Sequence, residues 1–197
     1  NKVYMISIDN ISENITNLLF LEEKNIRHLY ECSNCGYKGM LHRHGHYDRN
    51  VITLTQHFMI SIQRFKCPRC GKTYSLIPSF LIPYYIYAFD VVVFCLYCIF
   101  NLQKKSNYVC SILHDCNTKC FISIQSISFF KGRFLSKINL INSFFAAMDS
   151  FHYDSNLSIL SNDKAATIIL TKILRFNNSK CFNYEYFKNV SEYFLSL

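Results

Sequence analysis

The stretch CSNCGYKGMLHRHGHYDRNVITLTQHFMISIQRFKCPRCGKTY, residues 32–74, decides the fold, because it places two Cys-x-x-Cys pairs on either side of a strand-like segment. Cys32 and Cys35 form the first pair, Cys67 and Cys70 form the second, and glycine follows each pair. Four thiolates suit a closed tetrahedral zinc site of the structural type. The spacing therefore predicts one structural Zn²⁺ ion held by these four cysteines.

Other uses of the same cysteines remain open. Iron in the same sulfur tetrahedron would give an electron-transfer site of the rubredoxin type, and the spacing alone does not exclude it. A disulfide scaffold is a second alternative, but the sequence shows no export signal, which favours a reducing, cytoplasmic location. His42, His44 and His46 offer imidazole groups, although their alternation in an extended segment favours an exposed position over metal ligation.

The segment between the two pairs has strand periodicity. Apolar residues alternate with polar or smaller ones from Val51 to Arg64, which predicts a hairpin that turns near Gln56 and His57. A third strand is expected from Lys72 to Leu76. These strands would form a zinc ribbon, which is too small to hold together without its metal.

The segments on either side of the ribbon also have recognisable patterns. Residues 3–8 resemble a short strand, and a helix with an N-cap at Asn10 is expected over residues 11–24. Two prolines at 78 and 83 forbid a continuous helix and predict a stiff connector. The uninterrupted apolar run from 91 to 103 is too short for a membrane span, which needs about 20 residues.

Further helices are expected over residues 88–102, 104–114 and 121–138, and near 163–175 and 184–196. The first three have the order of a helix-turn-helix, with Ser123 as N-cap of the third. Gln125 and Ser126 would then reach base edges, while three basic residues would contact phosphates. These basic residues are Lys131, Arg133 and Lys137. An ordinary helical bundle explains the same pattern nearly as well.

The basic residues are concentrated in the middle of the chain, whose formal net charge is +8. Residues 32–72 carry seven Lys or Arg against one acid, and residues 73–148 carry six against two. A positive middle suits a polyanion such as double-stranded DNA, because phosphate neutralisation releases counterions. The alternative is a solvated basic surface. The candidate phosphate contacts in and beside the ribbon are Arg43, Arg49, Arg64, Lys66, Arg69 and Lys72.

The same stretch resembles a bacterial zinc-ribbon family (domain of unknown function 6431) that is related to the N-terminal DNA-binding half of insertion-sequence transposases. The resemblance covers about residues 30–87, with a weaker likeness of the following helices to transposase DNA-binding segments. It implies that ribbon and helices recognise the ends of a mobile element. The residues that carry it are Cys32, Cys35, Gly36, His44, Gly45, Tyr47, Arg49, Arg64, Cys67, Cys70, Gly71, Lys72, Thr73, Ser75, Leu76, Pro78, Phe80, Pro83 and Tyr84.

The nuclease domain of such transposases has no clear counterpart here. A nuclease needs three carboxylates that hold two divalent metals about 4 Å apart. The chain has enough acidic residues for a triad, namely Asp90, Asp149 and Glu185, but the sequence around them does not show a succession of strands. We therefore expect a protein without enzymatic activity and without a small-molecule substrate.

These observations predict an α+β protein, with a small three-stranded antiparallel zinc ribbon followed by a mainly α-helical domain. The expected function is zinc-dependent DNA binding in a mobile-element context. The alternatives are a zinc-ribbon module that binds a transposase or other protein, and a truncated transposase. The expected division is an N-terminal strand and helix at 1–29, the ribbon at 30–76, the connector at 77–87, a helical domain with a helix-turn-helix at 88–148, and C-terminal helices at 149–197.

Overall fold

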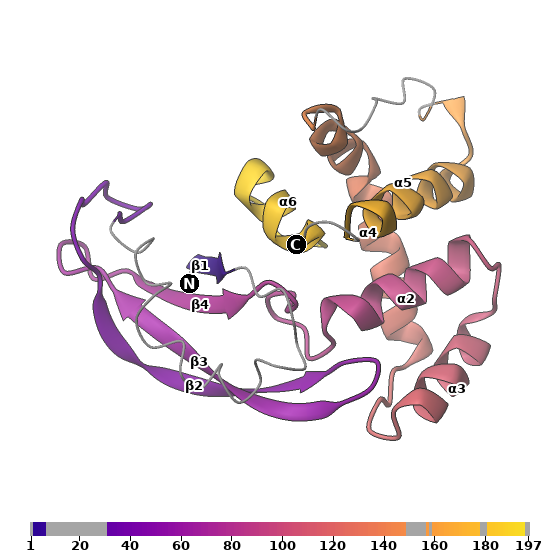
Figure 1. Ribbon diagram of the computed structural model, residues 1–197, viewed down its shortest axis with the longest axis horizontal. Coiled ribbons are helices and arrows are strands. Elements are labelled where there is room, and N and C mark those ends of the chain that lie inside the picture. The colour runs from indigo at the N-terminus through magenta and orange to yellow at the C-terminus, as the bar shows by residue number, and fades with distance from the viewer. Residues whose placement is uncertain (1, 7–30, 149–156, 158, 178–180, 196–197) are drawn as a thin grey trace.

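The computed structural model describes residues 2–6, 31–148, 157, 159–177 and 181–195. A long, curved β-hairpin runs along one side of the molecule, and the helices gather at one end of it (Figure 1). The strands precede the helices in the chain. The expected α+β class is therefore confirmed, whereas the helix predicted over residues 11–24 lies outside the described residues.

One sheet contains all the named strands. It has the order β1-β4-β3-β2, formed by β1 (Lys2–Ile6), β4 (Thr73–Pro78), β3 (His57–Lys66) and β2 (His42–Ile52). The β2–β3 and β3–β4 pairs are antiparallel, as a zinc ribbon requires. The strand predicted near residues 3–8 is present as β1, and it adds a fourth strand parallel to β4.

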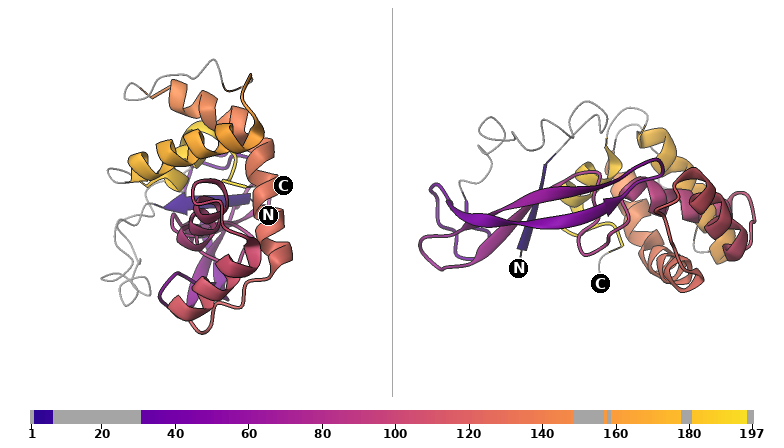
Figure 2. Two further views of the ribbon diagram at one scale, coloured as in Figure 1. Left: turned by 90° about the vertical axis from the view of Figure 1, so that its right-hand side faces the viewer. Right: turned by 90° about the horizontal axis from the view of Figure 1, so that it is seen from below.

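β2 begins earlier than the sequence alternation indicates. The alternation starts at Val51, but the strand starts at His42. Residues 42–48 are all exposed, so neither face carries an apolar pattern that would reveal a strand in the sequence. The hairpin is consequently longer than the ribbon predicted from the sequence, and Figure 2 shows how far it extends from the helices.

A β-bulge divides the hairpin into two parts. Arg43 is paired with Phe65, and His46 with Gln63, so two residues of β2 oppose one residue of β3. Gly45 lies in the bulge with a φ of +78°, a conformation that glycine adopts without steric cost. Side chains of β3 alternate between two apolar clusters on opposite faces of the sheet. Ile60 and Ile62 belong to one cluster, and Phe65, on the other face of β3, belongs to the cluster around the cysteines.

The proline-containing connector is part of the core. β4 continues through Pro78, and the residues from 79 to 83 are buried. Phe80 and Leu81 pack with the hairpin side chains, and Asn183 donates hydrogen bonds to the carbonyls of Ser79 and Leu81. The connector therefore anchors the sheet to the C-terminal helix.

The predicted helices beyond residue 88 are present. They are α2 (Phe89–Phe100), α3 (Ser106–Cys116), α4 (Ile124–Ala146), α5 (Asn162–Asn177) and α6 (Phe182–Val190). Ser123 caps α4, because its side chain accepts a hydrogen bond from the Ser126 N–H at 3.1 Å. The side chains on the inner face of α4 are buried and follow helical periodicity, namely Ile127, Phe130, Phe134 and Ile138.

The helix-turn-helix stays a prediction. Its two helices are normally joined by a turn of three or four residues. Here α3 ends at Cys116 and α4 begins at Ile124, so the connection is longer than that turn. α4 itself is 23 residues long and forms the centre of the helical cluster, with α2 and α5 packed against it (Figure 1).

Apolar packing holds the helices together. Phe182 is fully buried and stacks on Phe145, with Phe144, Phe176 and Phe194 around it. Cys95 and Cys98 are buried in this core as small apolar side chains, and all ten cysteines are free thiols. Among the described residues, no helix has both the length and the apolar composition that crossing a membrane requires.

Candidate metal centre

Two knuckles of the same geometry bring the paired cysteines together. In the first knuckle the Gly36 N–H donates to the Cys32 carbonyl at 2.8 Å, and in the second the Gly71 N–H donates to the Cys67 carbonyl at 3.0 Å. The glycines have φ angles of +66° and +70°. A side chain at either position would meet no close atom, so glycine is required for its backbone conformation and not for space.

The four sulfur atoms form a compact group. The Cys32 and Cys70 sulfurs are 3.6 Å apart, the Cys35 and Cys67 sulfurs are 3.7 Å apart, and all four lie within 4.8 Å of one another. A zinc ion with Zn–S bonds of about 2.3 Å would need sulfurs about 3.8 Å apart. Among the described residues, this is the one group of three or more His, Cys, Asp or Glu side chains that could hold a metal ion.

A second layer of residues supports the sulfurs. The Tyr74 hydroxyl lies 2.9 Å from the Cys32 sulfur, and the ring is buried. Leu41 and Phe65 pack in the same cluster as Cys32 and Cys67. Hydrogen bonds to metal-ligating groups orient them and tune the site. The sequence singled out the four cysteines but gave no sign of Tyr74, because its role depends on the pairing of β4 with β3.

Burial and hydrogen bonds shift the pKa values of three of the thiols in different directions. Burial alone would raise the pKa of Cys32, but hydrogen bonds from Tyr74 and from the knuckle backbone outweigh it and lower the pKa to about 6. The Lys72 N–H lowers the pKa of Cys70. Burial and the neighbouring thiols raise the pKa of Cys35 to about 12. Four sulfurs this close together are the ligand set that a divalent cation would complete, and the bound cation would favour their thiolate form.

The three histidines lie outside this sulfur group. His42, His44 and His46 are on the exposed half of β2, next to the bulge. None of them belongs to the group of possible metal ligands. Their exposed positions agree with the expectation from the sequence.

Several predicted DNA contacts surround the metal centre. Arg43 lies on β2, Lys66 lies at the end of β3, and Arg69 and Lys72 belong to the second knuckle. Lys66 and Arg69 are exposed, and Lys72 is half-buried. The register pairs Lys66 with His42 and with Thr73, so these side chains belong to one end of the sheet. We call residues 31–43 and 65–74 together the metal end.

Two of the predicted DNA contacts have structural roles. Arg49 is half-buried and donates to the carbonyls of Ile82 and Tyr85, so it fastens β2 to the connector, and burial lowers its pKa. Arg64 donates to the Thr73 hydroxyl at 3.3 Å across the β3–β4 pair. The sequence did not indicate these roles, because both contacts join separate segments of the chain.

The predicted contacts on α4 lie at the opposite end of the hairpin from the metal centre (Figure 1). Lys131 lies 4.0 Å from the Asp163 carboxylate, and Lys137 forms a 2.5 Å ion pair with Glu192. The Arg133 guanidinium stacks over an aromatic ring of the same helix. Gln125 and Ser126 lie in the first turn of α4, beside an aromatic pocket described below. The structure therefore separates the two predicted groups of DNA contacts.

Asp90, the first member of the conceivable nuclease triad, has a structural role. Its carboxylate accepts hydrogen bonds from the Leu54 N–H at 3.1 Å and the Val91 N–H at 2.7 Å, which joins the hairpin turn to α2. Burial raises its pKa. Glu185 lies on α6, and Asp149 lies outside the described residues.

Comparison with known protein families finds a match for one segment of the chain. Residues 32–98 match the family model of a domain of unknown function (DUF6431), which spans both knuckles, the hairpin, the connector and most of α2. No curated protein matches the chain. No solved structure matches it either. The segment that carries the four-cysteine centre is thus similar to this domain family, over roughly a third of the chain.

Proposed function

We propose that the protein is a zinc-dependent DNA-binding protein of the mobile-element type, in which the metal end contacts the phosphates of a duplex. The observation that carries this proposal is the four-sulfur group at the end of the sheet. Zinc fits the site because four thiolates with near-tetrahedral spacing are its preferred structural ligands. The metal would supply rigidity, and the protein side chains would supply the DNA contacts.

The charge around the metal centre supports a polyanionic partner. Residues 31–73 contain seven Lys or Arg and two Asp or Glu. Lys66 and Arg69 extend from elements that the cysteines hold together, on either side of Cys67. A rigid basic array of this kind neutralises several phosphates at once, which gives affinity with a steep dependence on salt.

Charge reversal at the metal end tests the proposal. Binding of the zinc-loaded protein to a duplex of about 30 base pairs is measured by fluorescence anisotropy over a salt series, for the wild type and for K66E/R69E/K72E. If each lysine or arginine contacts one phosphate, the slope of log Kobs against log salt becomes shallower by about 2 to 3. Loss of affinity at low salt accompanies this change.

A matched variant separates local contacts from overall charge. K164E/R175E/K188E changes the net charge equally, but its three exposed residues lie on α5 and α6. We expect it to keep most of the affinity and the wild-type salt slope. Equal losses in both triple variants, or no salt-sensitive binding by the wild-type protein, would contradict the proposal.

A protein-binding module is the second candidate, and one observation favours it. β2 is an edge strand of the sheet among the described strands, and its residues 42–48 are exposed. Exposed edges can accept an additional strand from a partner. A zinc-loaded protein that binds no duplex at any salt concentration would leave this candidate as the better explanation of the metal end.

A further inference from the structure

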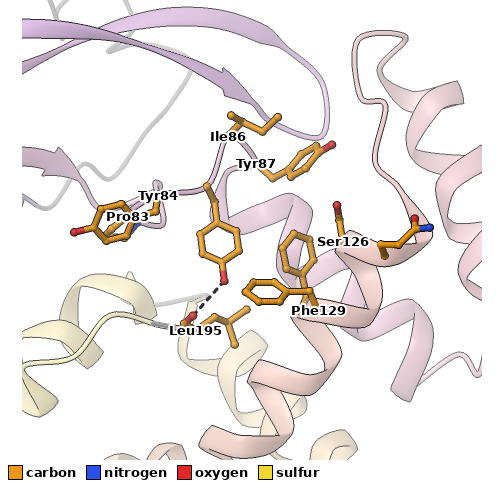
Figure 3. A pocket seen from close by; sticks show the side chains of 10 residues that line it. Pro83, Tyr84, Ile86, Tyr87, Ser126, Phe129 and Leu195 are labelled. Carbon is orange, nitrogen blue, oxygen red and sulfur yellow. Dashed lines mark hydrogen bonds between the residues drawn. The ribbon is translucent and has the colours of Figure 1, made fainter. Parts of the chain in front are cut away.

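An aromatic pocket lies where the connector meets the start of α4. It has a volume of about 790 Å³ and is lined largely by ring faces and edges (Figure 3). Tyr85 and Tyr87 come from the connector, and Phe129 and Phe130 come from α4. Open pockets of this size that are mostly apolar, with a few polar groups, are typical of small organic ligands.

The aromatic rings are held in place before any ligand binds. The Tyr85 hydroxyl donates to the Leu195 carbonyl at 3.2 Å, and the Tyr87 hydroxyl donates to the Phe121 carbonyl at 3.0 Å. The Tyr85 and Phe130 ring centroids are 5.5 Å apart. Rings fixed in this way form a stacking surface that loses little conformational freedom on binding.

Polar groups border the pocket on the side of α4. Gln125 is exposed, and its amide offers both donors and an acceptor. The Ser126 hydroxyl lies 3.0 Å from the Ser123 hydroxyl, at the N-cap of the helix (Figure 3 shows the Ser126 side chain). These are the groups that hydrogen-bond the edge of a heterocycle while its faces stack on rings.

A positive charge accompanies the rings. The Arg133 guanidinium lies 5.3 Å from the centre of the Phe129 ring. Burial raises the pKa of Tyr85, and the Arg133 charge opposes part of this increase. A cation beside a stacking surface favours an aromatic ligand that carries a phosphate.

Tyr84, at the rim, has a backbone conformation that is unusual for its residue type. Its φ is +71°, in the left-handed region that costs free energy for a residue with a side chain, and its side chain is 80% exposed. A tight turn accounts for this conformation, because the Tyr85 N–H donates to the Ile82 carbonyl at 3.2 Å with Pro83 and Tyr84 as the central residues. The turn holds the exposed Tyr84 ring at the rim of the pocket.

We propose that this pocket binds an unstacked nucleobase from a single-stranded segment adjoining the duplex. This inference rests on the proposed function and extends it to a second contact. β2 has 11 residues and, at roughly 3.3 Å per residue, spans roughly 36 Å, the length of about ten base pairs. One DNA molecule can therefore reach both the metal end and the pocket.

The test compares a blunt duplex of about 30 base pairs with the same duplex bearing a short 3′ or 5′ single-stranded thymidine overhang. A third probe carries abasic sites in place of the overhang bases and keeps the phosphates. Stacking of one base predicts about tenfold tighter binding of the better overhang probe than of the blunt duplex. The abasic probe should show no such gain.

Variants at the pocket assign the gain to its rings. F129L should remove the gain of the overhang and leave the affinity for the blunt duplex unchanged. Y108L is the matched control, because Tyr108 is similarly exposed (50%, against 44% for Phe129) and lies on α3 outside the pocket. The chain contains no tryptophan, so F129W also supplies a single fluorescent reporter, which should be quenched by the overhang probe and not by the abasic one.

The outcomes separate this inference from the proposed function. If the blunt duplex binds but neither overhang adds affinity or quenches F129W, the pocket proposal is wrong and the metal-end proposal stands. If the blunt duplex fails to bind while the overhang probe binds and quenches F129W, the pocket proposal stands and duplex recognition is wrong. A gain that persists with the abasic probe or in F129L also overturns the pocket proposal.

Discussion

The metal end and the helices illustrate two ways of stabilising one chain. The apolar cluster of the metal end is small, and it includes two of the cysteines themselves alongside Leu41, Phe65 and Tyr74. The helices instead bury an extensive aromatic cluster, in which Phe182 contacts several other rings. Since apolar burial is the main source of folding free energy, we expect the helices to hold themselves together and the metal end to depend on a bound ion.

The hairpin joins these regions, and a few polar contacts fix its far end. The Asn117 side chain donates to the carbonyls of Thr53 and Gln56, both at 3.0 Å. The Asp90 carboxylate accepts from the next turn residue, Leu54. The sheet thus has the four-cysteine group at one end and hydrogen bonds to helices at the other, and each can be removed separately.

The largest effect is expected from removing one sulfur ligand. C67S should abolish high-affinity metal binding and unfold the metal end, because apparent zinc-binding free energies of about 10–16 kcal/mol are coupled to folding in small zinc modules. Hydrogen exchange should increase at residues 31–48 and 64–76 and stay low in α2 and α4. The control is C116S, at an exposed cysteine of α3, which should change neither region. If C67S also loses exchange protection in α2 and α4, the helices do not hold together independently of the metal end.

Truncating a buried ring in the helices should destabilise the helices and leave the metal end unchanged. F182A removes the most extensively packed aromatic side chain of this core and should cost about 3–5 kcal/mol of unfolding free energy. Zinc content should stay at about one ion per chain. The measurements are thermal unfolding and elemental analysis. F121A, at a 73% exposed ring, should change stability by less than about 0.5 kcal/mol.

Breaking the attachment of the hairpin turn tests how the regions are joined. N117A removes two hydrogen bonds to backbone carbonyls, of which the one to Thr53 is buried, and should cost about 1–3 kcal/mol. Exchange should increase at residues 53–56 while metal affinity remains unchanged. N107A, on the exposed start of α3, is the control. A change in metal affinity in N117A would mean that the two attachments are coupled.

Removing the hydroxyl next to the metal centre should weaken metal binding without unfolding the site. Y74F keeps the buried ring but deletes the group that lies 2.9 Å from the Cys32 sulfur. Changes of this kind cost about tenfold in metal affinity, measured by competition with a chromophoric chelator. Y108F is the control, because Tyr108 lies on α3 and outside the four-cysteine group. It should bind zinc like the wild type.

The smallest effect is expected at the knuckle glycines. G36A and G71A place a side chain at φ angles of +66° and +70°, with no steric contact nearby. Each should cost about 1 kcal/mol through backbone strain alone. G132A, inside α4 where the added methyl group meets nothing, should instead stabilise the protein by roughly 1 kcal/mol. Chemical denaturation of the zinc-loaded proteins measures both the loss of stability in G36A and G71A and the gain in G132A.

The sequence predicts the metal centre well, because the chemistry is local. Cys-x-x-Cys-Gly encodes two ligands and the turn that aims them, so Cys32, Cys35, Cys67 and Cys70 could be grouped from spacing alone. The buried face of α4 was predictable for the same reason, since Ile127, Phe130 and Phe134 follow helical periodicity. The fully exposed start of β2 was not predictable, because a strand without a buried face has no alternation.

Contacts between distant segments explain what the sequence could not indicate. Arg49 was expected at DNA but donates to backbone carbonyls of the connector. The prolines indicated a stiff connector but not its burial, and Phe80 and Leu81 in it pack with hairpin side chains. Tyr74 also acquires its place beside Cys32 only when the sheet has formed. In each case the residue type is compatible with several roles, and the tertiary partner decides among them.

The most direct test of the account is duplex affinity with and without the metal. The zinc-loaded protein, the protein after chelation, and the chelated protein with zinc restored are titrated into the same duplex over a salt series. We predict salt-dependent binding that is lost on chelation and recovered with about one equivalent of zinc, while α2 and α4 remain protected from exchange. Salt-dependent binding of equal strength in the metal-free protein would contradict the central claim that the metal builds the DNA-binding surface.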